Sequence, residues 1–375
     1  MNKAYCFRIY PNDQQMILMA KTFGCCRFLY NQMLSDKIEE YQKNGKMLKN
    51  TPAMYKKTYS WLKEVDSLSL ANVQLHLEKA YKNFFRDTKV GFPKFKSKHK
   101  GKRSYTTNLV NGNIILDDTG LKLPKIGYVK IRQHREIPKE YQLKSVTVTQ
   151  ECSGKYYVSI LFAYENQVSE NSTTFAAIPE QEMSLGIDFA MHGLAVFSDG
   201  TKADYPMFYK DAEKKLSREQ RKLSRCRRGS SNYAKQRLKV ARCHEKVKNQ
   251  RKDYQHKLGR KIAEHYEVVC IEDLDLKTMS QNMHFGKGVM DNGYGMFINM
   301  LTYKMQDKGK KLIKIDRFYP SSKTCSCCGK IKSDLTLTDR IYHCTCGNHM
   351  DRDINAAVNI KNEGIRILKD SRNCA

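Results

Sequence analysis

Apolar positions in the first half of the chain repeat with two different periods. Residues 3–10 (KAYCFRIY) alternate with a period of two, which predicts a strand. Asn12 and Gln15 then form a capping-box pattern at the start of the longer period that is typical of helices. The helices expected from that period cover about residues 12–43, 52–64 and 67–86.

The period returns to two between about residues 104 and 164. Short apolar runs there are separated by turn sequences such as NGN, DDTG and SGK, and the stretch 146–164 predicts a hairpin of two strands. The first half is therefore expected to be a β-rich module with a helical insertion near its start. Residues 171–182 lack periodicity and predict a linker.

Strands and helices alternate in the second half, which predicts an α/β layer architecture. The stretch 184–200 (SLGIDFAMHGLAVFSDG) predicts a hairpin, and VVCIE at 268–272 predicts a buried strand. A long helical hairpin is expected over 207–261, with a break at Gly229. The segment 279–290 is rich in glycine and methionine and predicts a connecting loop.

Charge and cysteine content narrow the class of protein. The chain has 375 residues, with 67 lysines and arginines against 39 aspartates and glutamates, a formal net charge of +28. Because 40% of the residues are hydrophobic, this charge belongs to folded domains and indicates a polyanionic partner such as nucleic acid. The chain contains no run of 18 apolar residues, so no membrane-spanning helix is predicted.

The cysteine content bears on the compartment. Thirteen cysteines, an odd number, without an apolar leader argue against a secreted disulfide framework and favour the cytoplasm.

Five cysteines crowd into 22 residues near the end of the chain. Two pairs, CxxC and CxC, are each followed by glycine, a spacing that predicts a zinc ribbon closed by four thiolates. The expected ligands are Cys325, Cys328, Cys344 and Cys346. Cys327 and His343 lie beside them and are alternative ligands. A site closed by four thiolates is structural, because no position is left for a substrate.

Three carboxylates stand at the ends of predicted apolar elements. Asp188 ends one strand, Glu272 ends a second, and Asp353 begins the last helix, with Asp351 as an alternative to it. Carboxylates that converge from such positions are what a two-metal phosphodiester hydrolase needs to hold two Mg²⁺ ions. The sequence therefore predicts a magnesium-dependent site.

These motifs give the chain a resemblance to the TnpB family, the transposon-encoded relatives of type V CRISPR effectors. In the second half it is carried by GID at 186–188, IEDL at 271–274, DNGYGMF at 291–297, SSKTCSCCG at 321–329 and CGNHMDRDINAAVNI at 346–360. In the first half FRIYPNDQQ, GCCRFLYNQML, LEKAYKNFF and GFPKFKSK carry it. The CxC pair departs from the CxxC that is commoner in the family.

The resemblance implies an α/β RNase H-like (RuvC) nuclease domain with an inserted zinc ribbon, preceded by a wedge β-barrel with a helical recognition insert. The implied boundaries are 1–11 and 96–170 for the barrel, 12–95 for the insert, 171–182 for the linker, 183–320 and 351–375 for the nuclease, and 321–350 for the ribbon.

The resemblance also implies an activity, RNA-guided cleavage of DNA. The family binds a guide RNA from the transposon end and cuts matching double-stranded DNA beside a short transposon-adjacent motif. Asp188, Glu272 and Asp353 match its metal-binding carboxylates. The alternatives are a nuclease-dead RNA-guided repressor, a guide-independent nuclease or transposase, and a zinc-ribbon scaffold that only binds nucleic acid.

Two basic stretches are candidates for binding nucleic acid. The predicted hairpin 207–261 has 20 lysines and arginines against 5 acidic residues, more than a solvated helix pair needs. Its candidate phosphate-binding residues are Arg218, Arg221, Lys222, Arg225, Arg227, Arg228, Lys235 and Arg237. The second stretch offers Lys94, Lys96 and Lys98, interleaved with aromatic residues that are expected to pack. Asn72 and Gln74 are candidates for contacts to base edges.

Overall fold

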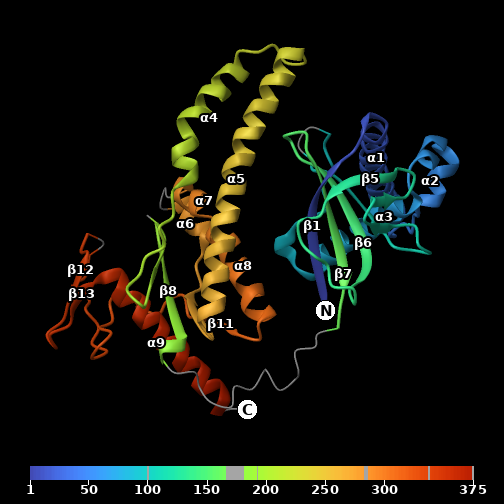
Figure 1. Ribbon diagram of the computed structural model, residues 1–375. Helices are drawn as coiled ribbons and strands as arrows, with labels where there is room; N and C mark the ends of the chain where they lie inside the picture. The colour runs from blue at the N-terminus through green and yellow to red at the C-terminus, as the bar shows by residue number, and fades with distance from the viewer. Residues whose placement is uncertain (99–100, 166–180, 192, 283–285, 337, 374–375) are drawn as a thin grey trace. The chain divides into compact units, whose positions relative to one another are not determined.

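The computed structural model describes residues 1–98, 101–165, 181–191, 193–282, 286–336 and 338–373 (Figure 1). The chain divides into two compact units, Met1–Gln167 and Val168–Ala375. Each unit has its own hydrophobic core. The predicted linker 171–182 lies almost entirely outside the described residues; Gln181–Met183 form a short 3₁₀ helix.

The amino-terminal unit contains one antiparallel sheet in the order β2-β6-β7-β1-β5-β4-β3. Its strands are β1 (Asn2–Tyr10), β2 (Arg103–Asn108), β3 (Ile115–Asp117), β4 (Gly120–Leu123), β5 (Gly127–Arg132), β6 (Gln142–Gln150) and β7 (Tyr156–Ala163). The predicted hairpin over 146–164 is confirmed as β6 and β7. Among the described residues no pairing joins β2 to β3, so closure into a barrel stays a prediction.

The helical insertion lies between β1 and β2, as predicted. It comprises α1 (Asp13–Asn44), α2 (Pro52–Thr58), α3 (Ser67–Arg86) and the 3₁₀ helices Ser60–Glu64 and Thr88–Val90. The capping box is confirmed, because the Gln15 amide donates to Asn12 Oδ1 at 2.9 Å and the Asn12 amide donates to Gln15 Oε1 at 3.0 Å. The helices share one core with the sheet, so insertion and sheet form a single folded body.

The carboxy-terminal unit has a four-stranded sheet in the order β11-β10-β8-β9. Its strands are β8 (Ser184–Ala190), β9 (Leu194–Phe197), β10 (Val268–Glu272) and β11 (Lys311–Ile315). Strand β10 runs parallel to both neighbours, and β8 and β9 form the predicted antiparallel hairpin. The carboxyl ends of β8 and β10 therefore meet at one edge of the sheet.

Six helices accompany this sheet in the described residues: α4 (Phe208–Ser224), α5 (Ser231–His265), α6 (Leu276–Asn282), α7 (Gly286–Asn292), α8 (Tyr294–Asp307) and α9 (Arg352–Asn373). Helices α4 and α5 form the predicted long hairpin (Figure 1). The prediction of a loop over 279–290 is wrong, because α6 and α7 cover most of it. Glycine lowers helix propensity by only about 1 kcal/mol, which tertiary packing can overcome.

Two glycines let α9 lie directly on the sheet (Figure 1). A Cβ at Gly186 of β8 would come within 2.0 Å of the Ala357 carbonyl oxygen of α9. A Cβ at Gly364 of α9 would come within 2.3 Å of Cys270 Sγ in β10. Such distances exclude any larger residue, so close contact of α9 with both central strands depends on these glycines.

None of the helices within the described ranges combines the length and the apolar composition that crossing a membrane requires.

Candidate metal centre and thiolate cluster

Asp188 and Glu272 are neighbours because of strand register. Ile187 of β8 pairs with Ile271 of β10 in parallel, so the residue that follows each of them lies at the same level of the sheet. The prediction that Asp188 ends its strand is wrong, because pairing with β9 extends β8 to Ala190, whereas β10 does end at Glu272. Burial, followed by the negative charges of Glu272 and Asp353, raises the pKa of Asp188 to about 8, while the nearby Arg352 opposes the shift. The structure thus brings the three predicted carboxylates into one electrostatic environment.

Glu272 is held by a residue from the segment that leads to the cysteines. The Ser321 hydroxyl donates a short hydrogen bond to Glu272 Oε1, and Ser321 itself is buried. Burial raises the pKa of Glu272, and the Ser321 hydrogen bond opposes that rise. The bond fixes one carboxylate oxygen and thereby orients the other.

The geometry distinguishes Asp353 from its neighbour Asp351. Asp351 Oδ1 accepts hydrogen bonds from the amides of Asp353 and Ile354, at 2.8 and 3.3 Å, and so caps α9. Its other oxygen pairs with Lys202 Nζ at 2.9 Å. Asp351 is therefore committed to structure, and Asp353, in the first turn of α9, is the better candidate for a metal ligand.

The carboxylates differ from the thiols in how closely they approach one another. No three carboxylates among the described residues bring their oxygens within 4.8 Å of one another, whereas the four thiols do. Three like charges repel unless a proton or a cation compensates them. Carboxylate oxygens are the ligands that Mg²⁺ prefers, so the donor set fits that ion.

The four predicted cysteines come together between β11 and α9. The sulfur atoms of Cys325 and Cys346 are 3.6 Å apart, as are those of Cys328 and Cys344. Four thiolates around zinc, each about 2.3 Å from the metal, stand about 3.8 Å from one another. The cluster therefore has the dimensions of a tetrahedral zinc site, and the CxC pair meets them as well as the CxxC pair does.

Local geometry explains the two glycines and places the two alternative ligands outside the thiol cluster. Gly329 and Gly347 follow the cysteine pairs with φ of 74° and 93°, a backbone region that disfavours other residues. Cys327 is exposed and lies outside the thiol cluster. The His343 ring stacks on His349, with ring centroids 4.2 Å apart, and is also outside the cluster.

Two buried asparagines of α9 connect the thiol cluster to the carboxylate-bearing helix. Asn355 accepts from the Ser326 amide at 3.0 Å and donates to the Thr324 carbonyl at 2.7 Å. Asn359 donates to the Ser321 carbonyl at 2.8 Å and also to Thr324. Ser321 is hydrogen-bonded to Glu272, so these contacts join the segment that orients Glu272 to α9, the helix that contains Asp353. Nothing in the spacing of Ser321, Asn355 and Asn359 indicates what they contact, so the sequence does not single out these three residues for this role.

The DNGY motif at 291–294 is a buried junction beside β8. Asn292 and Tyr294 both donate to the Ala190 carbonyl, at 3.3 and 2.7 Å. The buried Asp291 carboxylate accepts from the amides of Tyr209 and Lys210 at the start of α4. The motif therefore ties the end of the strand that carries Asp188 to the basic helical hairpin.

The basic residues predicted on that hairpin are exposed. All eight lie at or near its turn: Arg218, Arg221, Lys222, Arg225, Arg227, Arg228, Lys235 and Arg237. Glu219 is buried between the two helices, where it accepts from Gln236 Nε2 at 2.7 Å and lies 3.7 to 3.8 Å from Arg218 and Lys222. The exposed cations face solvent, the placement that phosphate binding needs.

The other candidates are placed less uniformly. Lys94 and Lys98 are exposed. The Lys96 ammonium lies 3.8 Å from the Tyr30 ring centroid. Burial of this end of the side chain lowers the pKa of Lys96, although the residue as a whole is largely exposed.

Asn72 is buried and donates to the Leu68 carbonyl of its own helix, which speaks against a contact with DNA bases. Its face turns to the core because α3 packs with Leu70 and Val73 inward. Gln74 is partly exposed and donates to Glu78 at 2.8 Å.

Three family models match different parts of the chain. A model described as "Probable transposase" (OrfB_IS605) matches residues 161–283, and one described as "Cas12f1-like, TNB domain" matches 294–360. A model described as "Helix-turn-helix domain" matches residues 1–46, which here form β1 and the single helix α1. The TNB match spans the thiol cluster and the start of α9.

Whole-chain relatives agree with these matches. The chain is 33% identical over 377 residues to the "Putative RNA-guided DNA endonuclease" of Streptomyces pristinaespiralis, covering 97% of this chain and 90% of that protein. It is 29% identical over 389 residues to the "Putative RNA-guided DNA endonuclease InsQ" of Escherichia coli (strain K12), covering 98% and 93%. The fold resembles the Cas12f1 chain of a cryo-EM complex with sgRNA and target DNA, with a TM-score of 0.58 at 13% identity over 96% of this chain and 99% of that one.

The fold is similar to that of Cas12f1, and in this chain a four-cysteine module, inside the stretch matched by the TNB model, interrupts a carboxylate-bearing α/β unit. The chain belongs to the TnpB family.

Proposed function

We propose that this protein is an RNA-guided DNA endonuclease that hydrolyses phosphodiester bonds with two Mg²⁺ ions. The observation that carries the proposal is that Asp188 and Glu272 lie on neighbouring strands and that, in addition to burial, Glu272 and Asp353, the latter on α9, both raise the pKa of Asp188 through their negative charges. Such carboxylates stand out in a chain with a net charge of +28, where most of the surface favours phosphate. The names of the two whole-chain relatives support the same activity.

In this mechanism the chain holds and orients the reacting groups. Asp188 and Glu272 would supply oxygen ligands from adjacent parallel strands, and Asp353 would supply one from α9. Ser321 keeps the Glu272 carboxylate from rotating. Two Mg²⁺ ions bound there would activate a water molecule and stabilise the leaving oxygen. Asp351 keeps the first turn of α9 capped, so that Asp353 has a fixed backbone position.

The proposal extends to the rest of the fold. The carboxy-terminal unit would be an RNase H-like (RuvC) nuclease, and the amino-terminal sheet would be the wedge barrel. The four thiols would hold a structural zinc ion, which their mutual distances fit. The exposed arginines of the α4–α5 turn would bind the guide RNA or its duplex with DNA. Recognition of a short transposon-adjacent motif on double-stranded DNA, in a prokaryotic cytoplasm, completes the proposed activity.

The decisive test is to sequence the RNA that copurifies with the protein and to supply DNA that matches its 3′ segment. Mg²⁺-dependent cleavage of the matched DNA, and no cleavage of a scrambled DNA, is the expected result. Cleavage of both DNAs would favour a guide-independent nuclease, and binding without cleavage would favour an RNA-guided repressor. A protein without copurifying RNA would contradict the proposal.

Neutralising the turn of the basic hairpin should weaken RNA binding. With Arg227 and Arg228 both replaced by alanine, we expect the slope of log affinity against log salt concentration to shrink by about 1.4, because two phosphate contacts to single-stranded RNA are lost. A salt titration of RNA binding measures this slope. Lys257→Ala is the matched control, since Lys257 is exposed on α5 but paired with Asp253 at 2.7 Å. Equal effects of both changes would show that the turn has no special role.

A further inference from the structure

The segment between β11 and the thiol cluster presents a phenylalanine to solvent. Phe318 is 86% exposed, the largest exposed fraction among the large hydrophobic residues of the described chain. Single exposed apolar residues are common and by themselves indicate nothing. Phe318 is distinguished by how its backbone is held and by the residues that hold it.

Both sides of the turn at Phe318 are anchored. The Phe318 amide donates to Asp316 Oδ1 at 2.8 Å. The next residue, Tyr319, packs against the core formed by β10, β11 and α9. The backbone at Phe318 is therefore fixed while its ring remains exposed, so a ligand that covers the ring need not order the turn first.

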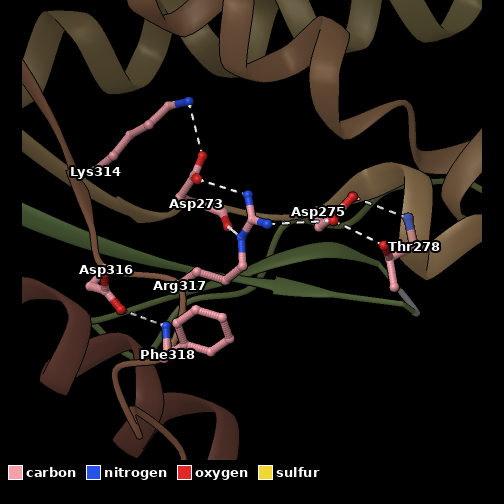
Figure 2. Close-up of polar contacts among 7 residues, drawn as sticks. All are labelled: Asp273, Asp275, Thr278, Lys314, Asp316, Arg317 and Phe318. Carbon is pink, nitrogen blue, oxygen red and sulfur yellow. Dashed lines mark hydrogen bonds and ion pairs between the residues drawn. The ribbon is translucent and has the colours of Figure 1, made fainter. Parts of the chain in front are cut away.

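The preceding residue, Arg317, locks the turn onto the strand that carries Glu272. Figure 2 shows its guanidinium between the carboxylates of Asp273 and Asp275. Arg317 Nε donates to the Asp273 carbonyl at 3.0 Å, Nη2 donates to Asp273 Oδ2 at 3.0 Å, and Nη1 lies 3.4 Å from Asp275 Oδ2. Lys314 pairs with the remaining Asp273 oxygen at 3.4 Å. Asp273 directly follows Glu272, and Ser321, three residues beyond Phe318, donates to Glu272.

These pairs also determine what kind of group the turn can bind. The charges of Lys314 and Arg317 are engaged by Asp273 and Asp275, and Asp316 adds a further negative charge. The turn is thus a poor site for phosphate, and its accessible group is an aromatic face. An aromatic face beside a site that cuts a nucleic acid suits an unpaired base, because every base can stack on it whatever the sequence.

We propose that Phe318 stacks on an unpaired nucleobase of the DNA strand that enters the carboxylate site, and so positions the phosphate to be cut. This inference rests on the proposed function and adds a positioning residue to it. Bases within a duplex are already stacked on one another, so the contact forms only after the guide has opened the DNA. Stacking tolerates any base, which suits an enzyme whose target sequence is specified by its guide.

The test uses the full-length protein with its copurifying RNA and matched DNA that carries 2-aminopurine at successive positions of either strand. Ca²⁺ replaces Mg²⁺ during the fluorescence measurement so that the DNA is not consumed. We expect quenching at one or two positions in the wild-type protein and its loss in Phe318→Ala. Single-turnover cleavage in Mg²⁺ should fall about tenfold in Phe318→Ala, recover in Phe318→Trp, and stay low in Phe318→Leu, which keeps an apolar side chain without a ring.

A matched control and several contradicting outcomes make the proposal falsifiable. Phe85 is 69% exposed in the amino-terminal unit, and Phe85→Ala should leave the quenching at those positions unchanged. Unaltered quenching and cleavage in Phe318→Ala would overturn the proposal. A lower melting temperature of Phe318→Ala without DNA would show that the ring packs within the protein, and reduced RNA retention would assign it to RNA instead. If the wild-type protein binds no matched DNA, the proposed function is contradicted as well. If the wild-type protein and all Phe318 variants cut matched DNA equally well, only the stacking is contradicted.

Discussion

Replacing Asp188 by alanine should abolish cleavage of guide-matched DNA while RNA and target DNA stay bound. Asp188 lies in β8 level with the end of β10, and the charges of Glu272 and Asp353 act on its carboxylate. Without it the site loses a metal ligand, so the single-turnover cleavage rate should fall by at least about 10³-fold. Binding should persist, because the exposed cations expected to contact phosphate lie elsewhere, on the α4–α5 turn.

Stability measurements separate this loss of ligand from a loss of fold. Burial raises the pKa of Asp188, which means that its ionised form is unfavourable in the folded metal-free chain. The melting temperature of Asp188→Ala should therefore equal or exceed that of the wild-type protein. Full cleavage by Asp188→Ala would refute its assignment as a metal ligand. Asp353→Asn should be as inactive as Asp188→Ala, whereas Asp351→Asn, which weakens the cap of α9, should keep measurable activity.

Replacing Cys325 and Cys328 together by serine should remove the zinc ion and unfold the module between β11 and α9. Few residues of this module are buried, chiefly Cys325, Tyr342 and Ser321, so its own core supplies little folding free energy. Zinc binding to such modules supplies on the order of 10 kcal/mol or more, which is then folding free energy. Metal analysis should find one zinc ion per wild-type chain and none in the double variant.

The adjacent cysteine and histidine provide matched controls. Cys327 is exposed outside the thiol cluster and His343 stacks on His349, so Cys327→Ser and His343→Ala should both retain zinc. Unchanged zinc in the double variant would exclude Cys325 and Cys328 as ligands. The double variant should also lose cleavage, because Asn355 and Asn359 connect the module to the segment and helix that hold Glu272 and Asp353.

Features that depend on neighbours in sequence were predicted well. The capping box of α1 involves residues three positions apart, and a fixed spacing suffices to recognise it. The cysteine pairs are also local, and each is closed by a glycine whose positive φ the turn requires. The strand hairpins β6–β7 and β8–β9 followed from alternation and turn residues.

Features that depend on packing were predicted less well. The glycines and methionines of 279–290 give a weak helical signal and predict a loop, whereas the structure has α6 and α7 there. Asn72 was a candidate for DNA contact, yet the buried face of α3 turns it toward the core. Composition shows that a helix exists, but only the elements packed against it decide which face is covered.

Short spacings and composition suffice to predict most of the helices and strands, the cluster of four cysteines and the excess of positive charge. Long-range packing sets the parallel pairing of β8 and β10, which makes Asp188 and Glu272 neighbours, and it leaves Asp353 rather than Asp351 without a capping role. Packing also brings Ser321, Asn355 and Asn359 into the contacts that link thiols and carboxylates, and it leaves the Phe318 ring exposed. The physical reason is that these contacts join residues far apart in the chain, and their partners are chosen by strand register and by the close approach of α9 at Gly186 and Gly364.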